Sequence, residues 1–458
     1  MWTRIAVGLG VALSLIVLIA SGARDSATAV VLDVTALGLM CAGAAAPLLG
    51  VAVWRGRGRS PRPATFRIAS AGLVVALAGA AVLARPPLLR YRSEDLAFKN
   101  GDVTLRGTLH LPRRGAPRAA VVLIHGSGCQ TRAEHRFYAR WLAERGVAAL
   151  AYDKRGCGAS NGALWESDYE DYAADAVAAV HRLKEHPGVA AARVGLVGFS
   201  EGEWVAPLAA ARAEAVRFVL VIGASGMSPA GQVEAEIALR LRARGHGEAA
   251  VEAALALNRE LFAYQRTGEG GDRLAALLRD GRQAPWFDDA QDIPAEVYAA
   301  EEYAWWRSVM DFDAERAWER VRVPVLLLKG ERDDRSPAGE MRRRISRALE
   351  RGGNAGLETV VYPGADHMLL SWPFGRNTPP PRFAGGFPDV LATWIHRQAA
   401  PDADGASGAA GVDHAVEAAR LSGSYRWESP PRSRRSICSR PSCGRAGCPS
   451  RRSGKRSA

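Results

Sequence analysis

Six short apolar runs, separated by stretches with helical periodicity, are the feature that most restricts how this 458-residue chain can fold. The runs lie at 119–124, 148–152, 194–197, 218–222, 323–328 and 358–362. Strands that are apolar on both faces, with helices between them, predict a mostly parallel sheet covered by helices. Alternating apolar and polar residues around Asn100-Gly101 predict an antiparallel hairpin with a two-residue turn before the first run.

A serine follows the third of these runs. The segment Gly198-Phe199-Ser200-Glu201-Gly202 stands between that run and an alanine-rich helical segment. A sharp turn from strand to helix would hold Ser200 in a strained, exposed position at the carboxyl edge of the sheet. The alternative is an ordinary serine at a helix N-terminus. The context on both sides predicts Ser200 as a nucleophile.

An acid and a histidine follow the last two runs. Asp333 and Asp334 come after the run at 323–328, and His367 comes after the run at 358–362. Asp333 is preferred over Asp334 for its place in the GERDD segment. The chain order serine, aspartate, histidine is the one that a nucleophile elbow of this kind requires. We therefore predict His367 as the general base and Asp333 as the acid that orients it.

A glycine-rich turn follows the first run. His125-Gly126-Ser127-Gly128 can direct a backbone N–H at a developing oxyanion. Ser127 is the expected donor, and the backbone N–H of Glu201 is the expected second donor. Gly126 and Gly128 would border the substrate, whereas His125 is expected to support the loop. A plain turn at the end of a strand is the alternative.

Residues from about 93 to 398 resemble the α/β-hydrolase superfamily, and within it the esterase and serine aminopeptidase (S33)-like branch. The segments that carry the resemblance are FKNGDVTLRGTLHLP, VVLIHGSG, YDKRGCGAS, GFSEGEWVAPLAA, VPVLLLKGERDD and YPGADH. The resemblance implies a mostly parallel central sheet flanked by helices, a Ser-His-Asp triad, an acyl-enzyme, and no metal or cofactor. Cys129 and Glu203 depart from the usual pattern, which often has proline and glycine at these places.

Five regions are expected along the chain. They are a membrane region at 1–92, a first core part at 93–227, a helical cap insertion at 228–320, a second core part at 321–399, and a disordered basic tail at 400–458. The cap contains Trp305 and Trp306, which we expect to bind substrate because large apolar side chains commonly line small-molecule pockets. The tail is rich in glycine, serine, proline and arginine and cannot bury a core.

The net charge of +12 lies in the two ends of the chain, because residues 93–400 hold 39 basic and 41 acidic residues. This balance excludes a core surface built for nucleic acid. Apolar stretches at 5–20, 29–54 and 68–84 predict about three transmembrane helices in the cytoplasmic membrane. Five arginines between the second and third stretches should stay inside, so the catalytic domain should be extracytoplasmic. The first stretch could instead be a signal peptide.

Two pairs of residues near the glycine-rich turn remain. Asp153 and Arg155 are expected to be structural ion-pair partners. Cys129 and Cys157 lie on loops after neighbouring strands, and we expect separate thiols there. A disulfide would be open to them if the domain is extracytoplasmic.

These features favour a membrane-anchored serine hydrolase that cleaves carboxylic esters or related acyl compounds of small size. Two alternatives in the same class are an aminopeptidase-like activity, with Glu201, Glu203 or cap acids recognising a free amine, and a thioesterase activity. An alternative from another class is a non-catalytic binding module that has the same fold. The complete set of Ser200, Asp333 and His367 argues against that module.

Overall fold

A mixed eight-stranded sheet forms the centre of the computed structural model, which describes residues 91–371 and 382–399. The strand order is β1-β2-β4-β3-β5-β6-β7-β8. The pairs β1-β2 and β2-β4 are antiparallel, and every other neighbouring pair in this sheet is parallel. The strands are β1 (Tyr91–Asn100), β2 (Val103–Pro112), β3 (Ala119–Ile124), β4 (Val147–Tyr152), β5 (Arg193–Phe199), β6 (Val216–Ile222), β7 (Val325–Gly330) and β8 (Leu357–Tyr362). The predicted mostly parallel sheet is confirmed.

The hairpin of β1 and β2 turns one residue later than the sequence analysis predicts. Asn100 pairs with Val103 in the ladder, so Gly101 and Asp102 form the two-residue loop. Gly101 has a φ of +57°, a backbone conformation that glycine adopts without steric cost. The conformational freedom of Gly101 therefore decides where the chain reverses.

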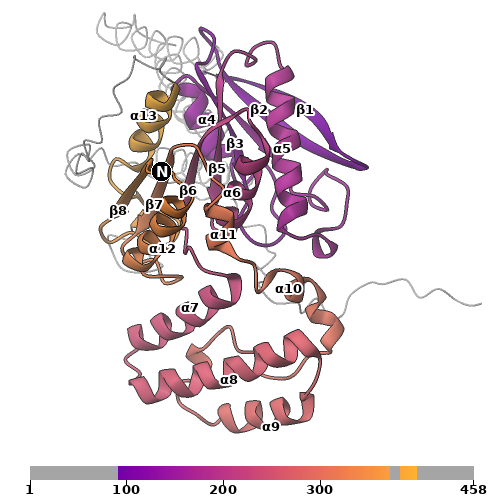
Figure 1. The fold of residues 1–458 in the computed structure, drawn as a ribbon, viewed down its shortest axis with the longest axis vertical. Helices are drawn as coiled ribbons and strands as arrows, with labels where there is room; N and C mark the ends of the chain where they lie inside the picture. Colours follow the sequence, from indigo (N-terminus) through magenta and orange to yellow (C-terminus); the bar gives the residue numbers. More distant parts are fainter. Residues whose placement is uncertain (1–90, 372–381, 400–458) are drawn as a thin grey trace, which may run out of the picture. The chain divides into compact units, whose positions relative to one another are not determined.

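Helices cover both faces of the sheet (Figure 1). One face packs against α4 (Arg136–Glu144) and α13 (Phe387–Ala399). The other face packs against α5 (Tyr169–Glu185), α6 (Gly202–Arg212), α11 (Ala314–Trp318) and α12 (Ala338–Arg351). The strands between them are buried on both faces, as the all-buried β3, β4 and β7 illustrate. Short elements complete this part: η1 (Leu164–Glu166), β9 (Leu370–Ser371) and β10 (Arg382–Phe383).

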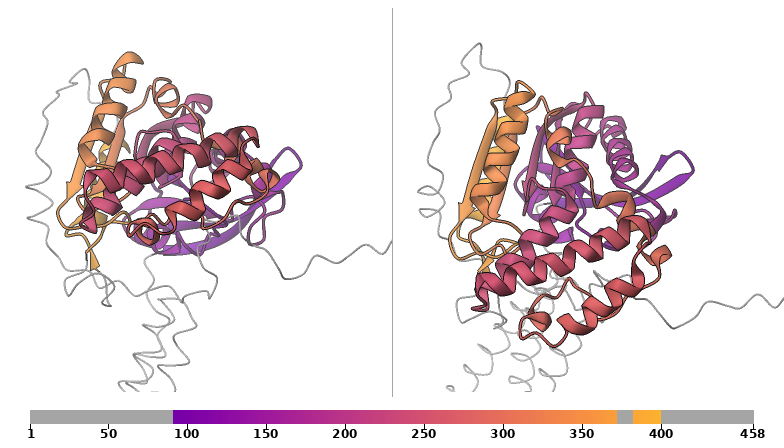
Figure 2. Two further views of the ribbon diagram at one scale, coloured as in Figure 1. Left: turned by 90° about the horizontal axis from the view of Figure 1, so that it is seen from below. Right: turned by 60° about the horizontal axis from the view of Figure 1, so that its bottom comes forward.

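A helical insertion leaves the sheet after β6 and returns at β7, the neighbouring strand. It consists of α7 (Pro229–Ala243), α8 (Glu248–Thr267), α9 (Gly271–Gly281), η2 (Phe287–Asp289), η3 (Ala300–Tyr303) and α10 (Ala304–Val309). α7 and α8 run side by side in both views of Figure 2, and with α9 they enclose an apolar cluster of their own. Ser228 caps α7 by accepting a hydrogen bond from the Gly231 N–H, with Pro229 at the first helical position.

The segment between α10 and β7 packs in the core of the sheet. Ala314, Ala317 and Trp318 of α11 are buried in the same cluster as α5, α6 and α12. The structure therefore has a separate helical cap from α7 to about α10, after which the chain rejoins the packing of the sheet.

The predicted membrane region and the predicted basic tail both lie outside the described residues. No helix within 91–371 or 382–399 is long and apolar enough to cross a membrane.

Candidate active site

Ser200 occupies the turn between β5 and α6 with a φ of +51°, in the left-handed region that non-glycine residues rarely enter. The turn is tight because two glycines flank it. A Cβ at Gly198 would lie 2.6 Å from the carbonyl oxygen of Gly202, so a side chain there would force the turn open. The backbone N–H of Ser200 donates to the carbonyl of Ile222, which ties the turn to the end of β6. The sequence thus folds locally into the strained strand-to-helix turn that the motif predicts.

Ser200, His367 and Asp333 come together at the carboxyl edge of the sheet. His367 Nε2 lies 2.9 Å from Ser200 Oγ, and His367 Nδ1 lies 2.9 Å from Asp333 Oδ2. The other carboxylate oxygen of Asp333 accepts a hydrogen bond of 2.9 Å from the backbone N–H of Arg335. Asp333, rather than Asp334, is the carboxylate in contact with His367. The three residues follow the parallel strands β5, β7 and β8, whose ends share one edge.

The imidazole of His367 rests against Gly223, the residue that follows β6. Gly223 has a φ of +76°, and a Cβ there would lie 2.7 Å from His367 Cε1. Any side chain at this position would push the ring out of line with Ser200 and Asp333. The sequence analysis did not identify Gly223, because an isolated glycine after a strand predicts only a turn.

Asp333 is ionised because of its neighbours. Its side chain is fully buried, and burial alone would raise the pKa of the carboxyl. Hydrogen bonds and the charges of His367 and Lys329 outweigh burial and lower that pKa to about 2. Lys329 Nζ lies 2.7 Å from Asp333 Oδ2. Asp333 therefore stays a carboxylate, the form that can accept the Nδ1–H of His367.

The turn predicted to hold oxyanion donors lies against the elbow. A Cβ at Gly126 would lie 3.5 Å from Ser200 Cβ, so the backbone of Gly126 passes directly beside the serine. The N–H of Gly126 donates to Gln130 Oε1 at 2.9 Å. Glu201 follows Ser200 and precedes α6. The structure thus brings the loop of Gly126, Ser127 and Gly128 next to the backbone of Glu201.

A buried lysine contacts the backbone of this loop. Lys154 Nζ lies 3.2 Å from the carbonyl oxygen of Gly126 and 3.4 Å from that of Gly128, and it forms an ion pair with the carboxylate of Glu201. Burial raises the pKa of the Glu201 carboxyl, and the charge and hydrogen bond of Lys154 oppose that effect. The sequence analysis missed Lys154. It also offered Glu201 as an amine-recognising acid, whereas the Glu201 side chain turns into the core to meet Lys154.

Glu203 is likewise buried rather than open to a substrate. Its carboxylate accepts hydrogen bonds from the N–H and Oγ of Ser225 and from the N–H of Gly226, at 2.6–2.9 Å. The suggestion that Glu203 recognises a free amine is therefore not supported, because its lone pairs point at the loop after β6.

Cys129 and Cys157 form a disulfide, with their Cα atoms 5.6 Å apart. The expectation of separate thiols is wrong. The bond joins the glycine-rich turn after β3 to the loop after β4, because β3 and β4 are neighbours in the sheet. The turn beside Ser200 is thus fixed by the disulfide as well as by Lys154.

His125 and His135 fill the space beneath this turn. His125 Nε2 lies 2.5 Å from the carbonyl oxygen of Tyr152, and the rings of His125 and His135 are 5.2 Å apart. Burial lowers the pKa of His125 well below its ordinary value and lowers that of His135 to about 3. Both rings are therefore neutral, which fits the supporting role expected for His125.

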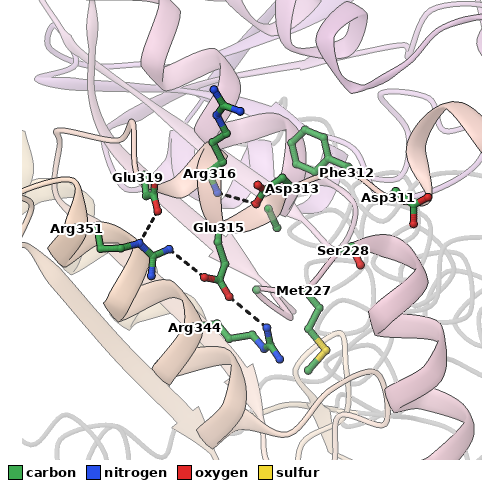
Figure 3. A pocket seen from close by; sticks show the side chains of 12 residues that line it. Met227, Ser228, Asp311, Phe312, Asp313, Glu315, Arg316, Glu319, Arg344 and Arg351 are labelled. Atoms are coloured by element: carbon green, nitrogen blue, oxygen red, sulfur yellow. Dashed lines mark hydrogen bonds and ion pairs between the residues drawn. The ribbon is translucent and has the colours of Figure 1, made fainter.

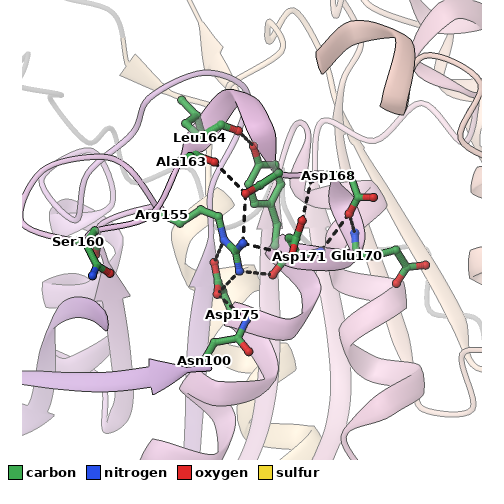
Figure 4. A network of polar contacts seen from close by, with 12 residues as sticks. Asn100, Arg155, Ser160, Ala163, Leu164, Asp168, Glu170, Asp171 and Asp175 are labelled. Atoms are coloured by element: carbon green, nitrogen blue, oxygen red, sulfur yellow. Dashed lines mark hydrogen bonds and ion pairs between the residues drawn. The ribbon is translucent and has the colours of Figure 1, made fainter. Parts of the chain in front are cut away.

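Asp153 and Arg155 each form an ion pair, although not with each other. Arg155 makes a bidentate contact to Asp175 of α5, at 2.6 and 2.7 Å (Figure 4). Asp153 pairs with Arg132 and accepts the N–H groups of Arg132 and Ala159. Asn100 also donates to Asp175, so this network ties the end of the β1-β2 hairpin to α5.

Trp305 and Trp306 lie at the joint between the cap and the core. The indole N–H of Trp305 donates to the carbonyl of Ser167 at 2.9 Å, and its ring lies edge-on to Trp165. The ring of Trp306 lies 6.1 Å from that of Phe262 in α8. None of these contacts involves Ser200, Asp333 or His367.

A second joint links the cap to the loop of Asp333. Arg335 forms an ion pair of 2.5 Å with Glu236 of α7. Glu236 is also paired with Arg240, which in turn contacts Asp292 at 2.9 Å. The cap helix α7 is therefore connected by charged groups to a residue two positions beyond Asp333.

A cavity of about 510 Å³ opens beside the start of α7 (Figure 3). Its lining is largely charged, and Arg344 and Arg351 there pair with Glu315 and Glu319. Ser200, His367 and Asp333 do not line it. We do not assign the substrate to this cavity, because no residue of the proposed triad lines it.

A family model for serine aminopeptidase S33 matches residues 115–371. Esterase EstD of Thermotoga maritima is 25% identical over 293 residues, which cover 62% of this chain and 63% of that protein. The chain thus spans slightly less than two thirds of the length of this curated relative.

Two solved structures are similar in outline. The Pyrococcus furiosus esterase Pf2001 has a TM-score of 0.42 and 19% identity, covering 68% of this chain and 92% of that one. The proline iminopeptidase of Mycobacterium smegmatis has a TM-score of 0.44 and 19% identity, covering 67% and 99%. Because the family model matches more than half of the chain, this protein belongs to the serine aminopeptidase S33 family of α/β-hydrolases.

Proposed function

We propose that this protein is a serine esterase that cleaves small carboxylic esters through an acyl-enzyme, with Ser200, His367 and Asp333 as its catalytic triad. The observation that carries the proposal is the unbroken chain of contacts from Ser200 Oγ through His367 to Asp333, with 2.9 Å at each step. These lengths are within the range in which a base can take the proton of a nucleophile.

The mechanism follows from the positions of these groups. Ser200 attacks the ester carbonyl while His367 Nε2 takes its proton, and the carboxylate of Asp333 keeps the Nδ1–H of the ring in place. The backbone N–H groups of Ser127 and Glu201 stabilise the oxyanion, and each such donor is worth about 3 kcal/mol in comparable sites. His367 then protonates the leaving alkoxide. Water activated by the same imidazole hydrolyses the acyl-enzyme and restores Ser200.

The surroundings of the elbow favour esters over peptides with a free amino terminus. An ammonium group would need a carboxylate without a partner, and three of the acids that could supply it, two after the elbow and one in the cap, are already engaged. Glu201 pairs with Lys154, Glu203 is bonded to Ser225 and Gly226, and Glu236 lies between two arginines. The resemblance to the Thermotoga maritima esterase, at 25% identity, points the same way. Thioesters, which also lack an amine, are a second substrate class that these contacts allow.

Kinetics with matched substrates test the proposal. The parent protein should turn over nitrophenyl esters of short acids faster than the corresponding aminoacyl nitroanilides. Ser200→Ala should reduce ester turnover by about 10⁴-fold or more. It should also abolish labelling by a fluorophosphonate probe. Ser308→Ala, a change at an exposed serine of α10, is the control and should retain parental rates. Ester turnover by Ser200→Ala at near-parental rates would rule out this nucleophile.

We further propose that the chain is anchored in the cytoplasmic membrane by about three helices within 1–92 and that the catalytic domain lies outside. The apolar stretches and the five arginines of the intervening loop support this orientation. The Cys129–Cys157 disulfide supports it independently, because disulfides persist in oxidising compartments.

Fusions to alkaline phosphatase test the orientation, since this reporter is active only outside the cytoplasm. A fusion after residue 90, immediately before β1, should be active, and a fusion after residue 58, inside the arginine-rich loop, should be inactive. An inactive but stably expressed fusion at residue 90 would place the hydrolase in the cytoplasm.

A further inference from the structure

A lysine lies inside the core at the carboxyl end of β7. Lys329 is fully buried, which is rare for a lysine unless its charge is compensated. Its ammonium group has three partners: the carbonyl oxygen of Ala224 at 2.8 Å, Ser336 Oγ at 2.8 Å, and Asp333 Oδ2 at 2.7 Å. An ammonium group has three N–H donors, so each can be satisfied without water. The site is therefore built for a charged lysine.

The contact with Asp333 brings this charge next to the proposed base. Asp333 Oδ2 receives both Lys329 Nζ at 2.7 Å and His367 Nδ1 at 2.9 Å. A cation and an imidazole that share one carboxylate oxygen interact strongly in a buried site. The positive charge of Lys329 opposes protonation of His367, whereas the negative charge of Asp333 favours it.

A second carboxylate approaches Lys329 from α6. Glu203 accepts hydrogen bonds from three donors, the N–H and Oγ of Ser225 and the N–H of Gly226, a pattern that suits a carboxylate because a protonated carboxyl would have to donate one bond. Burial raises the pKa of the Glu203 carboxyl, while these bonds and the charge of Lys329 oppose that effect. The segment 224–226 thus contacts both charged groups: the carbonyl oxygen of Ala224 accepts from Lys329, and Ser225 and Gly226 donate to Glu203.

The other charged groups around His367 have partners of their own. Asp366 accepts the backbone N–H groups of Met368 and Leu370. The guanidinium of Arg335 faces Glu236 of the cap and interacts with Asp334. Lys329 is the cation in contact with the carboxylate that His367 uses, so it is the group best placed to govern the protonation of this imidazole.

We propose that Lys329 is a positioning residue of the triad and that, together with Glu203, it sets the pH range in which His367 acts as a base. The proposal rests on the proposed function. Lys329 fixes the orientation of the Asp333 carboxylate and offsets part of its charge, so His367 stays neutral to lower pH than it would beside an unopposed carboxylate. Glu203 moderates this effect by neutralising part of the charge of Lys329.

The pH dependence of kcat/KM for a nitrophenyl ester tests this inference. Lys329→Met keeps the unbranched, flexible side chain, one atom shorter and without its charge, and it should move the acidic limb of the profile to higher pH by about 1 to 2 pH units. Glu203→Gln should move the limb to lower pH by a smaller amount, and the double variant should fall between the two. A lysine that only filled space would not move the limb. Lys99→Met, a change at an exposed lysine of β1, is the control and should reproduce the parental profile.

A measurement without turnover separates this inference from the proposed function. The NMR titration of the His367 ring, assigned by its disappearance in His367→Gln, should show its midpoint moving in the same directions in a Ser200→Ala background. An inactive parent would refute the proposed function, and the titration would still decide the role of Lys329. A folded Lys329→Met protein with parental limb and midpoint would overturn the inference. If Lys329→Met does not fold, an unshifted limb and an unshifted midpoint in Glu203→Gln would overturn it equally.

Discussion

The neutral histidines beneath the active-site turn predict a loss of stability in acid. His135 is fully buried, and burial lowers the pKa of its ring from 6.5 to about 3. Burial and two nearby arginines lower the pKa of His110 in β2 to about 4. Below pH 6.5 the unfolded chain binds protons at these positions that the folded protein does not bind. Stability is therefore complete above pH 6.5 and falls as the pH decreases toward 4.

The size of the effect follows from these pKa values. Between pH 7.5 and pH 5.0, each histidine with a folded pKa of 4 or below lowers the free energy of unfolding by about 2 kcal/mol. His125 is shifted in the same direction and adds to the loss. His110 and His135 together lower the free energy of unfolding by about 4 kcal/mol over this range, which is a large part of the stability of a typical domain.

His135→Phe is the variant that tests this reasoning. The ring of His135 packs 4.5 Å from that of Phe199, so a phenyl ring can replace it without leaving a cavity. Guanidinium titrations of the full-length protein, followed by circular dichroism, give the free energy of unfolding at pH 7.5 and 5.0. We expect the variant to lose about 2 kcal/mol less than the parent over this range. The control is His181→Gln at an exposed position of α5, which should behave like the parent. An identical pH dependence in His135→Phe and the parent would refute the argument.

Three further predictions concern residues around Ser200. Asp333→Asn should lower kcat/KM for esters by about 10⁴-fold, whereas Asp334→Asn should change it little; the reverse order in steady-state kinetics would transfer the acid's role to Asp334. Removing the disulfide by Cys129→Ala, or by dithiothreitol, should lower the free energy of unfolding by about 3.5 kcal/mol for a loop of this length, and thermal melts unaffected by either would mean that the bond does not form. Trp305→Ala and Trp306→Ala should shift the preference among acyl lengths if the cap sets substrate size, and an unchanged profile across a nitrophenyl ester series would leave both residues as packing groups.

The strands and the elbow could be predicted because their signals are local. Each apolar run coincides with a strand to within two residues at either end, because a strand buried on both faces needs a continuous apolar segment. Ser200 could be identified because a serine flanked by glycines, directly between such a strand and a helix, is typical of a nucleophile elbow. The turn of the first hairpin lies one residue later than predicted, since Asn100 and Asp102 both suit a turn beside Gly101, and the pairing of Asn100 with Val103 leaves Asp102 in the loop.

The disulfide and the partners of Trp305 and Trp306 could not be predicted, because they depend on contacts between elements that are distant in the sequence. Cys129 and Cys157 are separated by 28 residues, and they meet because β4 is inserted beside β3. Trp305 and Trp306 have the composition of a substrate pocket, yet their contacts are with Ser167 and Phe262. The composition of a cap segment favours contacts of its aromatic residues with other groups, but it does not indicate which partner each ring contacts.

The partners of the buried charged residues could not be predicted from the sequence, because local patterns suggest that these residues are exposed. A lysine at the end of an apolar strand, as in VLLLKG, indicates the point where the chain reaches solvent, and a glutamate after the elbow indicates a surface or substrate-binding acid. In the fold, Lys154 and Lys329 are both in the core, where leaving either without a carboxylate would cost several kcal/mol. Two lysines and three acids around one elbow allow several pairings. Lys329 pairs with Asp333 four residues further along the chain, whereas the fold brings Lys154 to Glu201 from another part of the sequence. Glu203, a departure from the family pattern, lies on α6 and is matched by the charge of Lys329 at the end of β7, which is the neighbour of β6 in the sheet.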